Sequence, residues 1–158
     1  MKVCVFRVGW QPFIEVPLWN LAETLANRGT EVTIVKSLAR ADLGMPEEAH
    51  PHAKTIFIGL FFKRVAKIRG LTMIARLLGW MEYVLRCVAI GLRERADLYI
   101  AIDVDAFPAA WLCARLRGKR CVLYAYELYA DRPGIAPRAF WAWLERTLTP
   151  VSYTHLTL

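Results

Sequence analysis

One stretch, residues 97–131, constrains the fold of this chain more than any other. Residues 98–102 are all apolar or aromatic, which is typical of a strand buried on both faces of a parallel sheet. Pro108 suits the first turn of a following helix, and Gly118 suits its end. Residues 121–125 then form a second buried strand. The stretch therefore predicts two parallel strands joined by a right-handed helical crossover.

The polar residues that follow these two strands form the first candidate site. Asp103 and Asp105 end the first strand, and Tyr126 and Glu127 end the second. Ligands of parallel α/β sheets bind beyond the carboxyl ends of the strands. Either aspartate can instead cap the next helix by accepting hydrogen bonds from its first N–H groups. Both interpretations stay open: helix capping, or the orientation of substrate hydroxyls.

The amino-terminal part repeats the alternation of strand and helix. Residues 2–8 and 31–35 are runs rich in β-branched residues, and residues 16–27 between them carry apolar side chains at helical spacing. Residues 55–60 are a further candidate strand. The pattern predicts the α/β class, with a doubly wound Rossmann-like parallel sheet and helices on both faces.

The most apolar stretch, residues 71–92, predicts a long helix. Its charged residues argue against a membrane span. Its polar face comprises Thr72, Arg76, Gly79, Glu82, Arg86 and Arg93. Two interpretations remain, a core helix or a helix that lies half on a membrane surface. The preceding cluster of cations is either a solvated face or a contact for anionic lipids. It comprises Lys63, Arg64, Lys67 and Arg69.

Composition narrows the choice of partners. The 158-residue chain is 56% hydrophobic and carries a net charge of +7, so an apolar body bears a basic surface. This balance favours a phosphorylated substrate or an anionic membrane surface. Nucleic acid is disfavoured, because the aromatic residues alternate with aliphatic ones and form no stacking platform among Lys and Arg. The apolar run between Lys2 and Arg7 is too short for a signal peptide, which predicts a cytoplasmic protein. If residues 63–92 contact a membrane surface, the protein would be peripheral on its inner face.

The sequence contains no recognised metal or phosphate motif. The four cysteines, Cys4, Cys87, Cys113 and Cys121, have no metal-ligand spacing, so we expect buried thiols in a reducing compartment. His50 and His52 lie in a polar loop, where we expect solvated side chains rather than a metal site. Glycine-rich phosphate-binding patterns and nucleophile motifs are absent from the sequence.

The carboxyl-terminal residues divide into two parts. Residues 138–148 have the pattern of an amphipathic helix, which Thr149 and Pro150 end. Residues 151–158 continue no recognisable pattern, and one back-translation of them resembles a sequencing-library adapter. We therefore interpret residues 1–150 as a Rossmann-like domain that is incomplete at its carboxyl end, and 151–158 as translated adapter. A native polar tail is the alternative.

Several motifs support a family resemblance. They are Asp97-Leu98, Asp103-Val104-Asp105-Ala106, Arg117-Gly118-Lys119-Arg120-Cys121-Val122-Leu123-Tyr124 and Glu127-Leu128-Tyr129. Together with residues 2–35, they resemble the amino-terminal half of a family 4 glycosyltransferase of the GT-B fold. The resemblance is weak over residues 37–92. The chain departs from the family pattern at Tyr126, where His is common, and at Gly9-Trp10, where Gly-Gly is common.

This resemblance implies that the chain is the acceptor-binding half of the enzyme. A second Rossmann-like half, absent here, would bind the nucleotide-sugar donor, which is a co-substrate, and neither a metal nor another cofactor is expected. The acceptor would be a saccharide or lipid-linked glycan, and the fragment alone would be inactive. Glu127 would be the candidate catalytic residue, and Gly9, Glu15, Asp103, Asp105 and Tyr126 would line the substrate cleft. The alternatives are a non-catalytic Rossmann-like module that docks on a membrane or partner protein, and another Rossmann-type enzyme such as a sugar-nucleotide epimerase.

Overall fold

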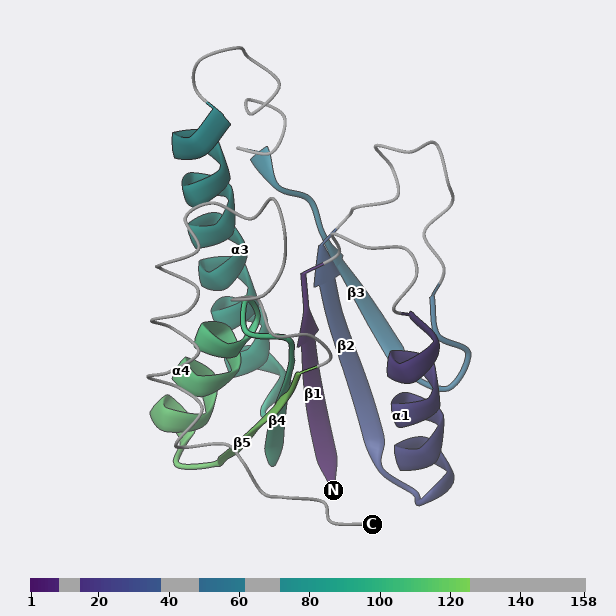
Figure 1. Ribbon diagram of the computed structural model, residues 1–158. Helices are drawn as coiled ribbons and strands as arrows, with labels where there is room; N and C mark the ends of the chain where they lie inside the picture. The colour runs from purple at the N-terminus through teal and green to yellow at the C-terminus, as the bar shows by residue number, and fades with distance from the viewer. Residues whose placement is uncertain (9–14, 38–48, 62–71, 126–158) are drawn as a thin grey trace.

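Five parallel strands form one sheet in the order β3-β2-β1-β4-β5 (Figure 1). The computed structural model describes residues 1–8, 15–37, 49–61 and 72–125, apart from the side chains of residues 15–17, 72, 73 and 76. The strands are β1 (Lys2–Arg7), β2 (Glu31–Ser37), β3 (Lys54–Ile58), β4 (Leu98–Ile102) and β5 (Arg120–Tyr124). Each lies within a few residues of its predicted position, and β4 matches it at both ends.

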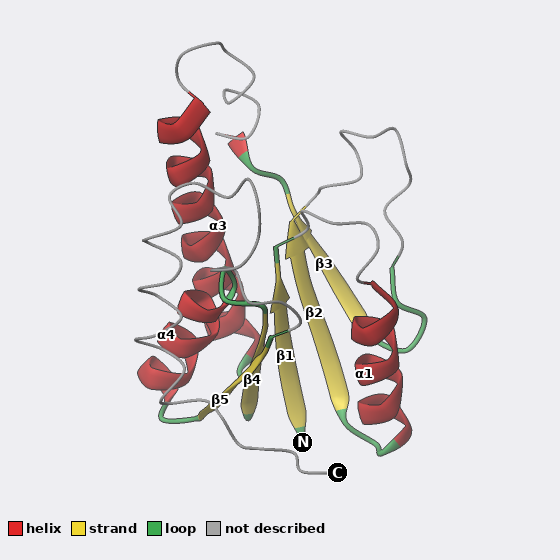
Figure 2. Cartoon of the chain, viewed as in Figure 1, coloured by secondary structure: helices red, strands yellow, loops and turns green. Residues whose placement is uncertain are grey.

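Helices cover both faces of this sheet (Figure 2). The helix α1 (Glu15–Asn27) packs on one face, where Leu18 and Ala22 contact the apolar residues of β1, β2 and β4. The helices α3 (Thr72–Glu94) and α4 (Phe107–Arg117) pack on the other face, around Phe6, Tyr83 and Tyr99. This arrangement confirms the predicted doubly wound α/β fold.

The end of α4 follows its sequence signals, whereas β5 does not. Gly118 adopts a left-handed backbone (φ 62°), and the Lys119 N–H donates to the Ala114 carbonyl at 2.8 Å, which closes the helix as expected. The strand β5 was expected to be buried on both faces, and this expectation is wrong. Val122 and Tyr124 are 38% and 40% exposed, because no described helix covers β5 on the side of the sheet where α1 packs.

The long helix α3 is half-buried, and its exposed side is apolar. Tyr83 and Cys87 lie in the core, whereas a row of large apolar side chains faces outward. This exposed row, called the α3 stripe below, comprises Ile74, Leu77, Leu78, Met81 and Leu85. The predicted polar face is correct only in part, since Gly79 is buried and the Glu82 side chain is 12% exposed in an ion pair with Arg86 (2.7 Å). None of the described helices is long and apolar enough to cross a membrane.

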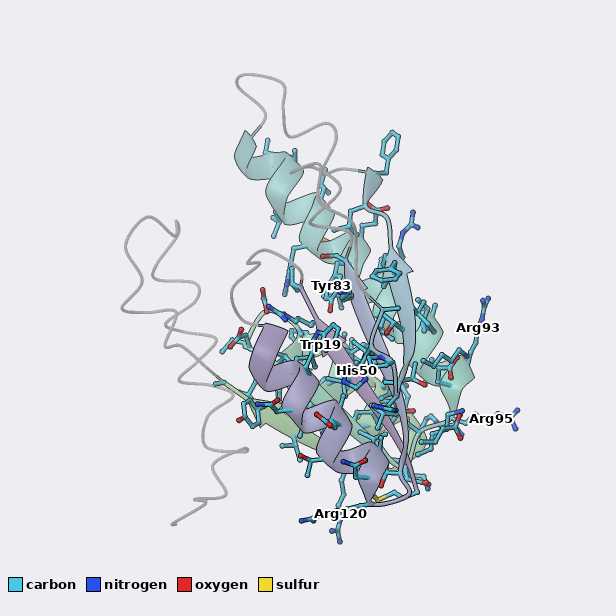
Figure 3. The ribbon with its side chains drawn as sticks, turned by 90° about the vertical axis from the view of Figure 1, so that its right-hand side faces the viewer. Trp19, His50, Tyr83, Arg93, Arg95 and Arg120 are labelled. Carbon is cyan, nitrogen blue, oxygen red and sulfur yellow. The ribbon has the colours of Figure 1, made fainter. Side chains whose placement is uncertain are left out.

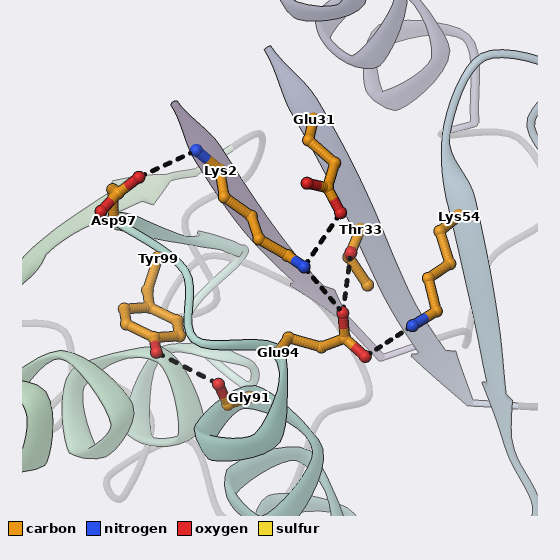
Figure 4. Close-up of polar contacts among 8 residues, drawn as sticks. All are labelled: Lys2, Glu31, Thr33, Lys54, Gly91, Glu94, Asp97 and Tyr99. Carbon is orange, nitrogen blue, oxygen red and sulfur yellow. Dashed lines mark hydrogen bonds and ion pairs between the residues drawn. The ribbon is translucent and has the colours of Figure 1, made fainter.

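A polar network fastens the end of α3 to the amino ends of the strands (Figure 4). The Glu94 carboxylate accepts from Lys54 Nζ at 2.7 Å, lies 3.5 Å from Lys2 Nζ, and accepts from the Thr33 hydroxyl at 3.3 Å. The hydrogen bond from Lys54, together with the positive charges of Lys54 and Lys2, lowers the pKa of Glu94 below its ordinary value. The network therefore joins α3 to β1, β2 and β3.

Candidate functional site

The candidate site is the carboxyl edge of the sheet, at the point where the strand order reverses. From β1 the chain proceeds to β2 and β3 on one side, and then returns through α3 to β4 on the other. Ligands of open α/β sheets bind at such a switch point. Four described charged residues lie at this edge. They are Arg7 at the end of β1, Lys36 one residue before the end of β2, and Asp103 and Asp105 just after β4.

The two aspartates lie in a tight turn that precedes α4. Asp103 has a left-handed backbone (φ 66°), and its N–H donates to the Tyr124 carbonyl at 3.0 Å, which extends the pairing of β4 with β5 by one residue. The Ala106 N–H donates to the Asp103 carbonyl at 3.3 Å and closes the turn. Ala106 is the N-cap residue of α4, and no side chain caps it. The prediction that Asp103 or Asp105 caps this helix is therefore wrong, because the turn places both residues ahead of the cap position.

The helix α3 holds this turn in place. The Trp80 indole Nε1–H donates to the Asp105 carbonyl at 2.9 Å. Asp105 is 7% exposed, and Val104 and Ala106 beside it are buried in the core. A carboxylate withdrawn from water in this way is usually held by specific contacts, and such groups are enriched at functional sites. The turn is thus a rigid, acidic element at the switch point.

Two buried cations, Arg7 and Lys36, lie beside each other at the same edge and were not among the predicted site residues. They are paired in the parallel register of β1 and β2, so their side chains share one face of the sheet. This is the α1 face, since Val5 and Ile34, two residues earlier, pack in the α1 cluster. Arg7 is 4% exposed and Lys36 is 5% exposed. Lys36 Nζ lies 5.0 Å from the centre of the Phe57 ring, a cation–π distance.

A sequence signal for these two cations does exist. Side chains alternate between the two faces of a strand, and each cation stands two residues after an apolar residue that faces the core. This spacing predicts a charged side chain on a buried face of the sheet. At the end of a strand, however, a charged residue can equally indicate that the chain leaves the core and enters solvent. The register between β1 and β2, which brings the two together, is visible only in the structure.

His50 is a buried structural residue, which corrects the expectation of a solvated side chain. It is 6% exposed, and its ring lies 5.0 Å from the Trp19 ring (Figure 3). Nδ1 accepts from the His52 N–H at 3.1 Å, so a neutral ring carries its proton on Nε2, which lies 3.2 Å from the Trp19 carbonyl. Nε2 thus connects the loop before β3 with α1, and Nδ1 closes a contact within that loop. His52 is exposed, as expected.

Most of the predicted site residues lie outside the described part of the chain. These are Gly9, Tyr126 and Glu127 of the expected cleft, and Lys63, Arg64, Lys67 and Arg69 of the expected membrane contact. Glu15 begins α1, but its side chain is also outside the description. Of the predicted cleft residues, the described structure brings only Asp103 and Asp105 together.

The cysteines form no disulfides and have the character of core residues. Cys4, Cys87 and Cys113 are buried and Cys121 is partly buried. Burial raises the pKa of Cys87 and of Cys121 to about 12, and that of Cys113 to about 11, so these thiols stay protonated at neutral pH. Within the described residues, no group of His, Cys, Asp and Glu side chains could hold a metal ion.

No family model matches this sequence, and a search of curated proteins finds no relative. Solved structures, in contrast, match it over nearly its whole length. The calicheamicin glycosyltransferase CalG4 matches 94% of this chain with a TM-score of 0.62 and 17% identity. UGT89C1 of Arabidopsis thaliana, complexed with UDP, matches 96% with a TM-score of 0.57 and 16% identity. SsfS6, the glycosyltransferase of Streptomyces sp. SF2575, matches 95% with a TM-score of 0.54 and 18% identity.

These matches concern the fold, since the identities are low. The chain spans 42% of CalG4, 41% of UGT89C1 and 44% of SsfS6, which is less than half the length of each. Its parallel five-stranded sheet with helices on both faces is the Rossmann-like unit that GT-B glycosyltransferases contain. The chain therefore has the α/β fold of one such unit.

Proposed function

We propose that this chain is the acceptor-side part of a GT-B glycosyltransferase of the family 4 type. The complete enzyme would transfer a sugar from a nucleotide-sugar to a saccharide or lipid-linked acceptor. Residues 1–150 would belong to the native protein and residues 151–158 would not. The donor-binding half would lie beyond Pro150, so the present chain would not catalyse transfer alone.

The observation that carries this proposal is the fold, because glycosyltransferase structures match this parallel five-stranded chain over almost its whole length. Two of those proteins, UGT89C1 and SsfS6, were crystallised with the nucleoside diphosphates UDP and thymidine diphosphate, respectively. The motifs of residues 97–131, which resemble family 4, support the finer assignment. In this proposal Asp103 and Asp105 line the acceptor cleft, and Glu127 is the candidate catalytic residue.

The test begins with the source DNA beyond the Pro150 codon. We expect the reading frame to continue for about another 150 residues, with a second series of strands and helices. The complete protein should then transfer sugar from UDP- or TDP-sugars, and Glu127→Gln should lower kcat at least tenfold. Glu23→Gln, an exposed position on α1, is the matched control and should leave kcat unchanged. A stop codon near Pro150 would refute the proposal that the chain belongs to a transferase.

We propose, second, that the α3 stripe rests on an anionic membrane surface. Its exposed members include Leu85 at 67%, Ile74 at 60% and Leu77 at 53%. A row of large apolar side chains that is exposed to water is unfavourable unless a partner or a membrane covers it. The cations of residues 63–69 precede α3 in the chain, and each cation near an anionic bilayer contributes about 1 kcal/mol of binding. Apolar insertion and charge attraction would thus act on the same segment.

Vesicle sedimentation tests this second proposal. The full chain should sediment with phosphatidylglycerol vesicles and not with phosphatidylcholine vesicles. Leu77→Gln with Leu85→Gln should weaken this binding. Leu116→Gln on α4 is the control, because Leu116 is 64% exposed but lies outside the α3 stripe. Equal binding by all variants would show that the α3 stripe does not touch the membrane.

A further inference from the structure

The amino edge of the sheet, opposite the candidate site, carries a concentrated excess of positive charge. This edge comprises the last turn of α1, α3 and α4, the connection that follows each of these helices, and the first residue of each strand. Nine cations and three carboxylates lie there, so six positive charges are unbalanced at this end of the molecule. The whole chain has a net charge of +7. The excess is therefore large and local.

Each carboxylate of the amino edge forms an ion pair with a lysine of the same edge. The pairs are Lys2 with Glu31 (2.9 Å), Lys54 with Glu94 (2.7 Å) and Lys119 with Asp97 (3.3 Å).

Five exposed arginines of this edge form no ion pair within the described part of the chain. They are Arg28, Arg93, Arg95, Arg115 and Arg120. Figure 3 shows Arg93, Arg95 and Arg120 pointing away from the sheet. The ninth cation, Arg117, donates to the Leu92 carbonyl at 3.3 Å. The five exposed guanidinium groups are thus available to a partner.

The helix ends explain only part of this charge. The carboxyl ends of α1, α3 and α4 all lie at the amino edge, and each carries a partial negative charge of about half an elementary charge. Three such ends offset about one and a half of the six positive charges. The residue type also matters, because all five available cations are arginines. Arginine is enriched in protein interfaces and lysine is depleted, and a guanidinium pairs with both oxygens of a carboxylate.

We propose that the amino edge binds an acidic segment of a partner protein through these arginines. They lie on both faces of the sheet, since Arg28 follows α1 and Arg93 ends α3. A membrane that rests on the α3 stripe runs along the axis of α3 and meets the amino edge at a right angle, so lipid reaches only the rim beside α3. An extended acidic peptide can cross the whole edge. The inference does not depend on sugar transfer, because this edge lies opposite the candidate site.

Fluorescence anisotropy of a labelled poly-glutamate peptide, titrated with the full chain, tests this surface. We expect binding that weakens as the salt concentration increases. A triple variant with Arg28→Gln, Arg95→Gln and Arg120→Gln, called the amino-edge variant, removes one exposed cation from each of three connections. Its affinity should fall about threefold to a hundredfold, the range for three exposed ion pairs.

The matched control variant carries Arg64→Gln, Lys67→Gln and Arg69→Gln. It loses the same charge from the segment that leaves β3 and enters α3 at the opposite edge of the sheet, and it should bind the peptide as the wild type does. Failure of the wild type to bind the peptide, or equal losses of affinity in the two variants, would overturn the proposal.

Vesicle sedimentation separates a protein partner from a lipid surface. The amino-edge variant should bind phosphatidylglycerol vesicles more strongly than the control variant, because the membrane contact proposed above involves residues 63–69 and the α3 stripe. The reverse order would assign the amino edge to lipid and refute a protein partner there.

Discussion

Gly91 lies where α3, α4 and β1 meet, and Gly91→Ala should destabilise the fold. A Cβ atom at this position would lie 2.6 Å from Phe6 Cζ and 2.7 Å from Cys113 Sγ, well inside normal contact. Neither neighbour can yield easily, since both are fully buried and the Phe6 ring stacks in parallel on Tyr99. Overpacking of a core costs about 1–3 kcal/mol, and two such overlaps belong at the upper end, about 3 kcal/mol. Alanine returns about 1 kcal/mol through its helix propensity, which leaves a net loss of about 2 kcal/mol.

Urea unfolding followed by circular dichroism measures this loss. Ala89→Gly, at an exposed position of the same helix, calibrates the propensity contribution and should cost about 1 kcal/mol. In a Cys113→Ala background one of the two overlaps disappears, so Gly91→Ala should cost at least about 1 kcal/mol less than in the wild type. If Gly91→Ala instead stabilises the protein by the amount that Ala89→Gly destabilises it, the packing argument is refuted.

Two other features give matched predictions on stability. Tyr99 donates to the Gly91 carbonyl at 3.1 Å, whereas the buried Tyr83 hydroxyl has no hydrogen-bond partner among the described residues. Tyr99→Phe should therefore lower the unfolding free energy by about 1 kcal/mol, and Tyr83→Phe should leave it unchanged or raise it; equal losses in urea unfolding would contradict this. Because its pKa is lowered in the folded state, Glu94 contributes stability above its unfolded-state pKa and loses it as the pH falls through the folded-state pKa. Glu94→Gln should cost about 1 kcal/mol at neutral pH, and this cost should shrink as the pH falls through the folded-state pKa of Glu94 in the same assay; a cost that does not change with pH would contradict the ionic contribution.

Local signals were sufficient to predict the described strands and helices. Gly118 ends α4 and the apolar run of residues 98–102 forms β4, because turn chemistry and hydrophobic periodicity act within a few residues of each other. The predictions failed where a residue's surroundings come from elsewhere in the chain. His50 is buried by Trp19, about thirty positions away, and β5 is exposed because no described helix covers one of its faces. Sequence spacing contains neither fact.

The carboxyl edge of the sheet could be located from the sequence, but not all of the charged residues that lie at it. The carboxyl edge of the sheet follows from the parallel topology, and Asp103 and Asp105 lie there. Arg7 and Lys36 lie at that edge too, and their significance depends on the register between β1 and β2. A shift of one residue would turn one of them to the other face of the sheet. Register is a tertiary property, so the cation pair could not be derived from strand patterns alone.

The helix α3 explains how a rigid edge and an exposed apolar surface arise together. Near one end Glu94 holds it to Lys2 and Lys54 at the amino ends of the strands, and further along Trp80 holds the turn of Asp105 at the carboxyl edge. These contacts fix the helix along the whole depth of the sheet, so it cannot roll to bury the α3 stripe without breaking them. The stripe therefore stays exposed because the same helix positions the acidic turn. A surface that cannot be withdrawn in this way is suited to contact with another apolar layer, which supports our proposal that the α3 stripe rests on a membrane while the carboxyl edge of the sheet stays open to substrate.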